Sequence, residues 1–155
     1  MKKQKNGDKK YTTITLVIGV FILLLIYAAT PKVVDKEELK ATDEIYSQIC
    51  QNGDIIQQVL GSLSNSEIST DELMSKLGTV NSKLIILISQ ANESELDDYG
   101  NAISDVAQLY YDISISLMNH VNASDKDALK KAEDSAAKLI IAKAKVEEIR
   151  SKLTE

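Results

Sequence analysis

Few side chains in this sequence have catalytic or metal-binding chemistry, and their spacing does not assemble a site. His120 is the single histidine, and Leu117 stands three residues before it where a carboxylate would be needed. A two-histidine metal site or a repeated Glu-x-x-His pair is therefore excluded. We expect His120 to be a hydrogen-bonded residue near a helix end, with pH sensing as the alternative.

Cys50 is the only cysteine, so neither an intramolecular disulfide nor a cysteine-based zinc site can form. It lies far beyond the apolar segment near the N-terminus, where a lipid-modified cysteine would follow directly. We expect Cys50 to be a small buried hydrophobic residue. An intermolecular disulfide is the alternative.

Three aspartates, Asp98, Asp105 and Asp112, are spaced by seven residues and share one helix face. Neighbouring members stand about 10 Å apart along a helix axis, too far to bind one Ca²⁺ ion together. We interpret the row as a solvated acidic face. Because no nucleophile motif and no glycine-rich phosphate loop occurs either, the sequence predicts no enzyme, no metal and no cofactor.

The net charge of −5 is unevenly distributed along the chain. Five lysines and one aspartate occur before Thr12, which leaves an excess of nine negative charges on the rest of the chain. Phosphates would repel such an acidic domain, so nucleic acid is not an expected partner.

An uncharged apolar stretch runs from Thr12 to Ala29 and has the length of a single membrane span. The preceding lysines predict a cytoplasmic N-terminus, because basic residues stay on that side of the membrane. We expect a basic tail over 1–11, a transmembrane signal anchor over 12–30 and an extracytoplasmic domain over 31–155. A cleavable signal peptide is the alternative, although Tyr27-Ala28-Ala29 is a poor cleavage site.

The domain reads as all-α, because apolar residues recur at alternating steps of three and four in four separate runs. The first helix is expected from about Asp35 to Leu63. Ser69, Ser94 and Ser124 are expected to start the next three, each with an acidic residue three positions later. The core positions of the four runs are Leu39, Thr42, Tyr46, Ile49, Gly53, Ile56, Leu60 and Leu63; Leu73, Leu77, Val80, Leu84, Leu87 and Ala91; Leu96, Tyr99, Ile103, Val106, Tyr110, Ile113, Leu117 and His120; and Leu129, Ala132, Ala136, Leu139, Ala142, Val146, Ile149 and Leu153.

Short connections make consecutive helices antiparallel neighbours, which favours an up-down-up-down four-helix bundle. Two long hairpins pairing between chains, as in a coiled coil, would show the same periodicity. In the bundle, the last helix returns toward the membrane and carries most of the basic residues. Its candidate membrane-surface contacts are Lys143, Lys145, Arg150 and Lys152. Alternatively, these cations neutralise the acidic helices beside them.

The sequence contains more large apolar residues than the four stripes can bury. Ile85 and Ile86 each point about 130° away from a core centred between Leu84 and Leu87. The full candidate partner surface is Ile85, Ile86, Tyr111, Ile115, Ile140 and Ile141. Such residues indicate a partner-binding or self-association face, unless the buried stripes are wider than predicted or the aliphatics are exposed singly.

The layout resembles, at the level of fold only, membrane-anchored four-helix sensor domains, which usually have a second membrane helix that leads to a signalling domain. This sequence shows no second apolar span, so we expect no autonomous signalling. The expected function is a membrane-anchored interaction module of a microbial cell envelope, such as an accessory, adaptor or immunity protein. Its expected partners are the lipid bilayer, another envelope protein and, as an option, a second copy. A sensor holding a small ligand near Thr42 and Gly53 is the alternative.

Overall fold

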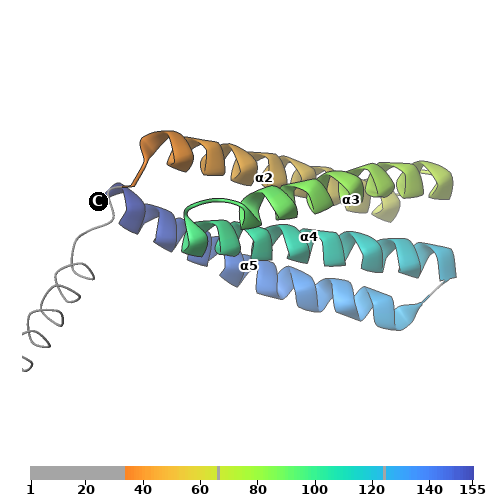
Figure 1. Cartoon of the computed structure of the whole chain (residues 1–155). Coiled ribbons are helices and arrows are strands. Elements are labelled where there is room, and N and C mark those ends of the chain that lie inside the picture. The colour runs from red at the N-terminus through yellow and green to blue at the C-terminus, as the bar shows by residue number, and fades with distance from the viewer. Residues whose placement is uncertain (1–33, 66, 124) are drawn as a thin grey trace, which may run out of the picture. The chain divides into compact units, whose positions relative to one another are not determined.

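The computed structural model describes residues 34–155 except 66 and 124. They contain four α-helices and no strand, which confirms the predicted all-α domain (Figure 1). The helices are α2 (Lys36–Ser64), α3 (Thr70–Asn92), α4 (Asp97–Ala123) and α5 (Lys126–Thr154).

The helix starts follow from local side-chain chemistry, with two corrections to the prediction. Ser69 caps α3 as expected, because its hydroxyl accepts a hydrogen bond from the Glu72 amide at 3.2 Å. Asp125 rather than Ser124 caps α5, since its carboxylate reaches the amides of Asp127 and Ala128. Ser94 was expected to cap the third helix, but it lies three residues before the first residue of α4, Asp97.

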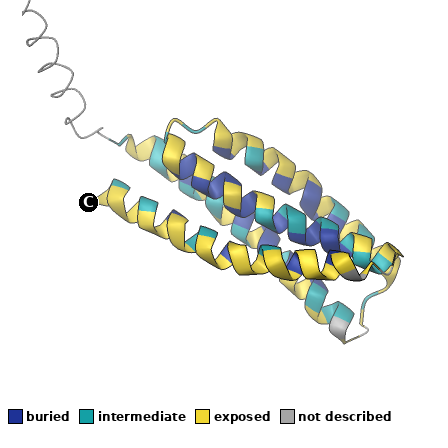
Figure 2. Ribbon diagram, turned by 90° about the horizontal axis from the view of Figure 1, so that it is seen from below, coloured by how far each residue is buried: buried dark blue, intermediate teal, exposed yellow. Residues whose placement is uncertain are grey.

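Consecutive helices pack side by side, and α2 also contacts α4 across the bundle (Figure 1). By contrast, no Cα atom of α2 lies within 8 Å of a Cα atom of α5. The fourth helix is therefore held mainly by α4, and most of its surface is exposed (Figure 2). The chain forms its core within one copy, as the bundle predicts.

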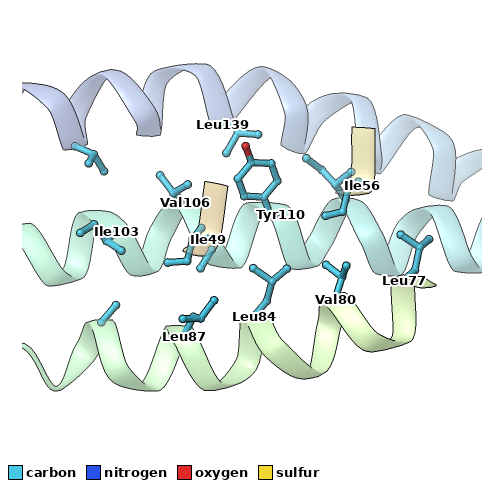
Figure 3. Packing of buried hydrophobic residues seen from close by; sticks show 14 of the residues in the cluster. Ile49, Ile56, Leu77, Val80, Leu84, Leu87, Ile103, Val106, Tyr110 and Leu139 are labelled. Carbon is cyan, nitrogen blue, oxygen red and sulfur yellow. The ribbon is translucent and has the colours of Figure 1, made fainter. Parts of the chain in front are cut away.

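The core is built on the predicted stripe of α3, whose six apolar positions are all buried. Tyr110 of α4 lies at its centre and is 2% exposed, among Leu84, Val106 and Leu139 (Figure 3). Gly53 of α2 makes room for this ring, because a Cβ atom at that position would overlap it. The space beside Gly53, where the sensor alternative would hold part of its ligand, is therefore filled by the Tyr110 ring.

The predicted stripe is least accurate on α5. Leu129 is 39% exposed and Ala136 is also exposed, whereas both were predicted to lie in the core. The separation of α5 from α2 explains the difference, because a stripe needs helices on two sides to be covered fully.

Among residues 34–155, with the two gaps noted above, no helix is both long and apolar enough to cross a membrane. The predicted anchor at 12–30 and the basic tail at 1–11 lie outside the described residues.

Candidate interaction faces

Two adjacent isoleucines stand on the solvent side of α3. Ile85 is 55% exposed and Ile86 is 58% exposed, while Leu84 and Leu87 beside them are buried. A helix turns by about 100° per residue, so one stripe cannot cover four aliphatic residues in succession. The structure thus places both isoleucines outside the core.

A second pair stands on α5, where Ile140 is 74% exposed and Ile141 is 72% exposed. Ala137 and Ala144 are exposed one turn to either side of this pair. Charged residues surround the four positions, among them Lys130, Glu133, Asp134, Glu148 and Lys152. The apolar area on α5 is therefore a short patch rather than a continuous stripe.

The two remaining apolar candidates, both on α4, are less exposed than the isoleucine pairs. Tyr111 and Ile115 are half-buried, and Tyr111 packs against the core. Nearby, the Asn81 amide of α3 donates to the Met118 sulfur at 3.4 Å, which links α3 to α4. Tyr111 and Ile115 are therefore weaker candidates for a partner surface than the isoleucine pairs.

Side chains bridge α2 and α5 at one end of the bundle. The Arg150 guanidinium of α5 donates to both carboxylate oxygens of Asp43 at 2.9 Å, and the Tyr99 hydroxyl donates to the same carboxylate at 2.5 Å. The guanidinium holds the pKa of Asp43 below its usual value, the Tyr99 hydrogen bond acts in the same direction, and burial opposes both. Three helices are thus tied together by one carboxylate.

The four predicted membrane-surface cations have partners within the chain. Arg150 bonds Asp43, and Lys145 lies 3.8 Å from Asp105 of α4. The Lys143 ammonium lies 5.3 Å from the centre of the Tyr110 ring, and Lys152 pairs with Glu148 in its own helix. The contacts of Arg150 and Lys145 match the neutralisation alternative, and contact with a lipid surface stays a prediction.

A groove of about 380 Å³ runs between α2 and α3. Its lining residues are Glu38, Ala41, Thr42, Glu44, Ile45, Gln48, Gln90, Glu93 and Ser94. Part of this lining also holds the fold, because Glu38 accepts hydrogen bonds from the Ser94 hydroxyl and the Glu95 amide. Thr42, one of the two weak core positions, is fully buried beside the groove and bonds Ser94 at 2.9 Å.

Cys50, His120 and two residues of the aspartate row are packed or bonded within the domain. Cys50 is half-buried, and burial raises the pKa of its thiol, which disfavours the nucleophilic thiolate. The Nδ1 atom of His120 is hydrogen-bonded to the Asp125 carbonyl at 2.8 Å, across the α4–α5 turn. Asp105 and Asp112 contact Lys145 and Gln108. Within the described part of the chain, no three potential metal ligands lie together.

Comparisons with known proteins do not add an identity. No protein-family model matches the chain, and no curated protein or solved structure is significantly similar to it.

Proposed function

We propose that this chain is a membrane-anchored helical interaction module, whose exposed isoleucines bind another protein outside the cytoplasm. The observation that carries the proposal is the exposure of four isoleucines, Ile85 and Ile86 on α3 and Ile140 and Ile141 on α5. Their exposed fractions are 55–74%. Fully burying one such side chain is worth roughly 1.5–3 kcal/mol, so a partner covering either pair would gain substantially.

The anchoring half of the proposal is supported by the sequence alone. The uncharged stretch from Thr12 to Ala29 follows a lysine-rich tail and precedes the helical domain. Protease added to intact cells should then remove residues 34–155 from a membrane-associated chain. Protection of these residues until the cells are lysed would contradict an extracytoplasmic domain.

Photo-crosslinking in cells tests the interaction half. A photoreactive residue at Ile86 or Ile141 should form protein adducts, because both positions would lie in an interface. The same residue at Gln57, an exposed polar position of α2, serves as the matched control. Equal adduct formation at all three positions, or none at any, would contradict the proposal.

A ligand-binding sensor is the second candidate, and the groove between α2 and α3 favours it. Three carboxylates line the groove, from Glu38, Glu44 and Glu93, so its chemistry suits a small organic cation. A ligand present at 100 times its Kd stabilises a protein by about 2.7 kcal/mol. Thermal-shift measurements with organic amines should show this gain in the wild type and its loss in Glu44→Gln. Amines that leave the melting temperature unchanged would exclude this class of ligand.

A further inference from the structure

We infer that α5 detaches from the bundle as one unit while α2, α3 and α4 stay folded, and that the Arg150–Asp43 ion pair holds α5 in place. The closed form is the structure described above, and the open form is the same chain with α5 released. Neither the proposed membrane anchoring nor the proposed partner is needed for this opening, so the two proposals can fail separately.

The helices α2, α3 and α4 enclose a core without α5. Each of these three helices contacts both of the others, whereas α5 contacts α4 alone (Figure 1). Among the four described helices, no Cα atom of α5 lies within 8 Å of a Cα atom of α2 or α3. The central cluster of buried apolar residues is distributed in the same way, because α5 contributes only Ala132, Leu139 and Val146 to it. Release of α5 would therefore leave most of the core in place.

The apolar contacts of α5 are unevenly distributed along the helix. Near its start the buried side chains are Ala128 and Ala132, and alanine buries little area. The larger buried side chains, Leu139 and Val146, come later in the helix. Most of the remaining surface of α5 is exposed (Figure 2). Segments with few buried apolar side chains open at the lowest cost in free energy, so α5 is the helix that we expect to open first.

The two ends of α5 are held by different contacts. At the start of the helix, the Nδ1 atom of His120 is hydrogen-bonded to the Asp125 carbonyl at 2.8 Å, which keeps this end beside α4. Near the other end, the Arg150 guanidinium donates to both carboxylate oxygens of Asp43 at 2.9 Å. The pair joins α2 to α5 although their Cα atoms stay more than 8 Å apart. It therefore holds the end of α5 that the α4–α5 turn does not.

The Arg150–Asp43 pair can break without leaving a buried charge unpaired. The side chain of Arg150 is 45% exposed and that of Asp43 is 27% exposed, so water reaches both groups. When Arg150 leaves, Asp43 keeps the hydrogen bond from the Tyr99 hydroxyl of α4. Ion pairs with this exposure contribute little stability, and the desolvation penalty of a buried charge does not arise. The pair thus favours the closed form without making opening costly.

Opening of α5 would enlarge the apolar surface of the domain. In the closed form, Leu139 and Tyr110 point toward each other (Figure 3), and the Lys143 ammonium lies 5.3 Å from the centre of the Tyr110 ring. Release of α5 uncovers this side of α4, while Ile140 and Ile141 are exposed already in the closed form. A partner that covers the newly exposed residues would shift the population toward the open form.

Hydrogen exchange of the full chain, followed by mass spectrometry at neutral pH, tests the opening. Amides in residues 139–146 of α5 should exchange at least about tenfold faster than amides in residues 80–87 of α3, because the α5 amides need only the release of α5. Their exchange should also respond less to added urea, since this opening exposes less surface than global unfolding does. Equal exchange rates with equal urea dependence in the two segments would show one cooperative unit and overturn the inference.

Truncation of the core separates the opening of α5 from global unfolding. Leu77→Ala should speed exchange in residues 80–87 by at least about thirtyfold, because Leu77 is fully buried on α3. Exchange in residues 139–146 should stay at the wild-type rate, since the open form retains the packing around Leu77. Val80→Ala, a smaller truncation at a position 1% exposed, gives the same comparison if Leu77→Ala does not fold. Equal acceleration of both segments would overturn the inference.

Arg150→Gln tests whether the ion pair holds α5. This variant removes the charge that faces Asp43 and keeps a long side chain, so exchange in residues 139–146 should rise about three- to fivefold. Lys152→Gln is the matched control, because Lys152 pairs at 2.6 Å with Glu148 of its own helix. It should change the same exchange by less than about twofold. No acceleration in Arg150→Gln, or an equal acceleration in Lys152→Gln, would overturn the role of the pair.

Discussion

Replacing Gly53 with alanine should destabilise the domain, although alanine is the better helix former. The helix gains roughly 1 kcal/mol from the exchange. The added Cβ atom, however, would overlap the ring of Tyr110, which is 2% exposed and packed on all sides. Overpacking of this kind costs about 1–3 kcal/mol, and the rigid ring places the cost near the upper end. We expect a net loss of about 1–2 kcal/mol.

Urea unfolding of a fragment spanning residues 34–155, followed by circular dichroism, measures this loss. Gly61→Ala is the control, because its Cβ meets no atom within 4 Å, and it should gain about 0.5–1 kcal/mol. In a Tyr110→Leu background the penalty at Gly53 should disappear, which a double-mutant cycle would record as coupling. If Gly53→Ala stabilises the fragment as Gly61→Ala does, the packing of α2 against α4 is wrong.

Two further outcomes follow from the core and from the Arg150–Asp43 link. Leu84→Ala should lower the unfolding free energy of the fragment by about 2–5 kcal/mol, because Leu84 is fully buried. Ser82→Ala, at an exposed position, should change it by less than about 0.5 kcal/mol. Equal losses of stability in the two variants would mean that the buried face of α3 is misplaced. Arg150 lowers the pKa of Asp43, so this link stabilises the fold above the unfolded-state value of about 3.9 and loses its effect as the pH falls through the lower folded-state value. Asp43→Asn should therefore cost about 1 kcal/mol in urea melts at pH 7 and progressively less as the pH falls through the lowered pKa of Asp43, and a pH-independent difference would contradict the charge assignment.

The helices could be predicted because their signals are local. All six apolar positions of α3 are buried as the heptad pattern predicts, and the Ser69 cap forms as its spacing to Glu72 indicates. The pattern was weaker on α5, where alanine occupies three of its eight predicted core positions. Alanine buries little area on either face, so its spacing specifies the orientation of a helix poorly.

Contacts between distant residues could not be predicted in the same way. Asp43 and Arg150 are separated by 107 positions, and no local pattern links them. No local pattern indicates that Asn52, Asn81 and Ser114 are buried, each with a polar atom that lacks a partner within the described residues. Polar residues in the core become visible only once the packing of the helices is known.

The candidate surface was predicted in part, for a geometric reason. Ile85, Ile86, Ile140 and Ile141 lie outside the core because adjacent residues diverge by about 100° on a helix. Tyr111 and Ile115 share that property, yet other residues of the domain half-bury them. Periodicity gives the direction of a side chain from its own helix, but not which directions other helices fill.

The central claim is that the exposed isoleucines bind a protein, and the variant Ile85→Lys/Ile86→Lys tests it most directly. Both side chains are more than half exposed, so the fragment of residues 34–155 should keep a cooperative melt close to the wild type. In cells, the full-length variant should lose photo-adducts formed from a photoreactive residue at Ser89, which is exposed on α3 one turn beyond Ile85 and Ile86. A collapsed melt would show that α3 is buried all round, and unchanged adducts with an unchanged melt would show that these isoleucines bind no partner.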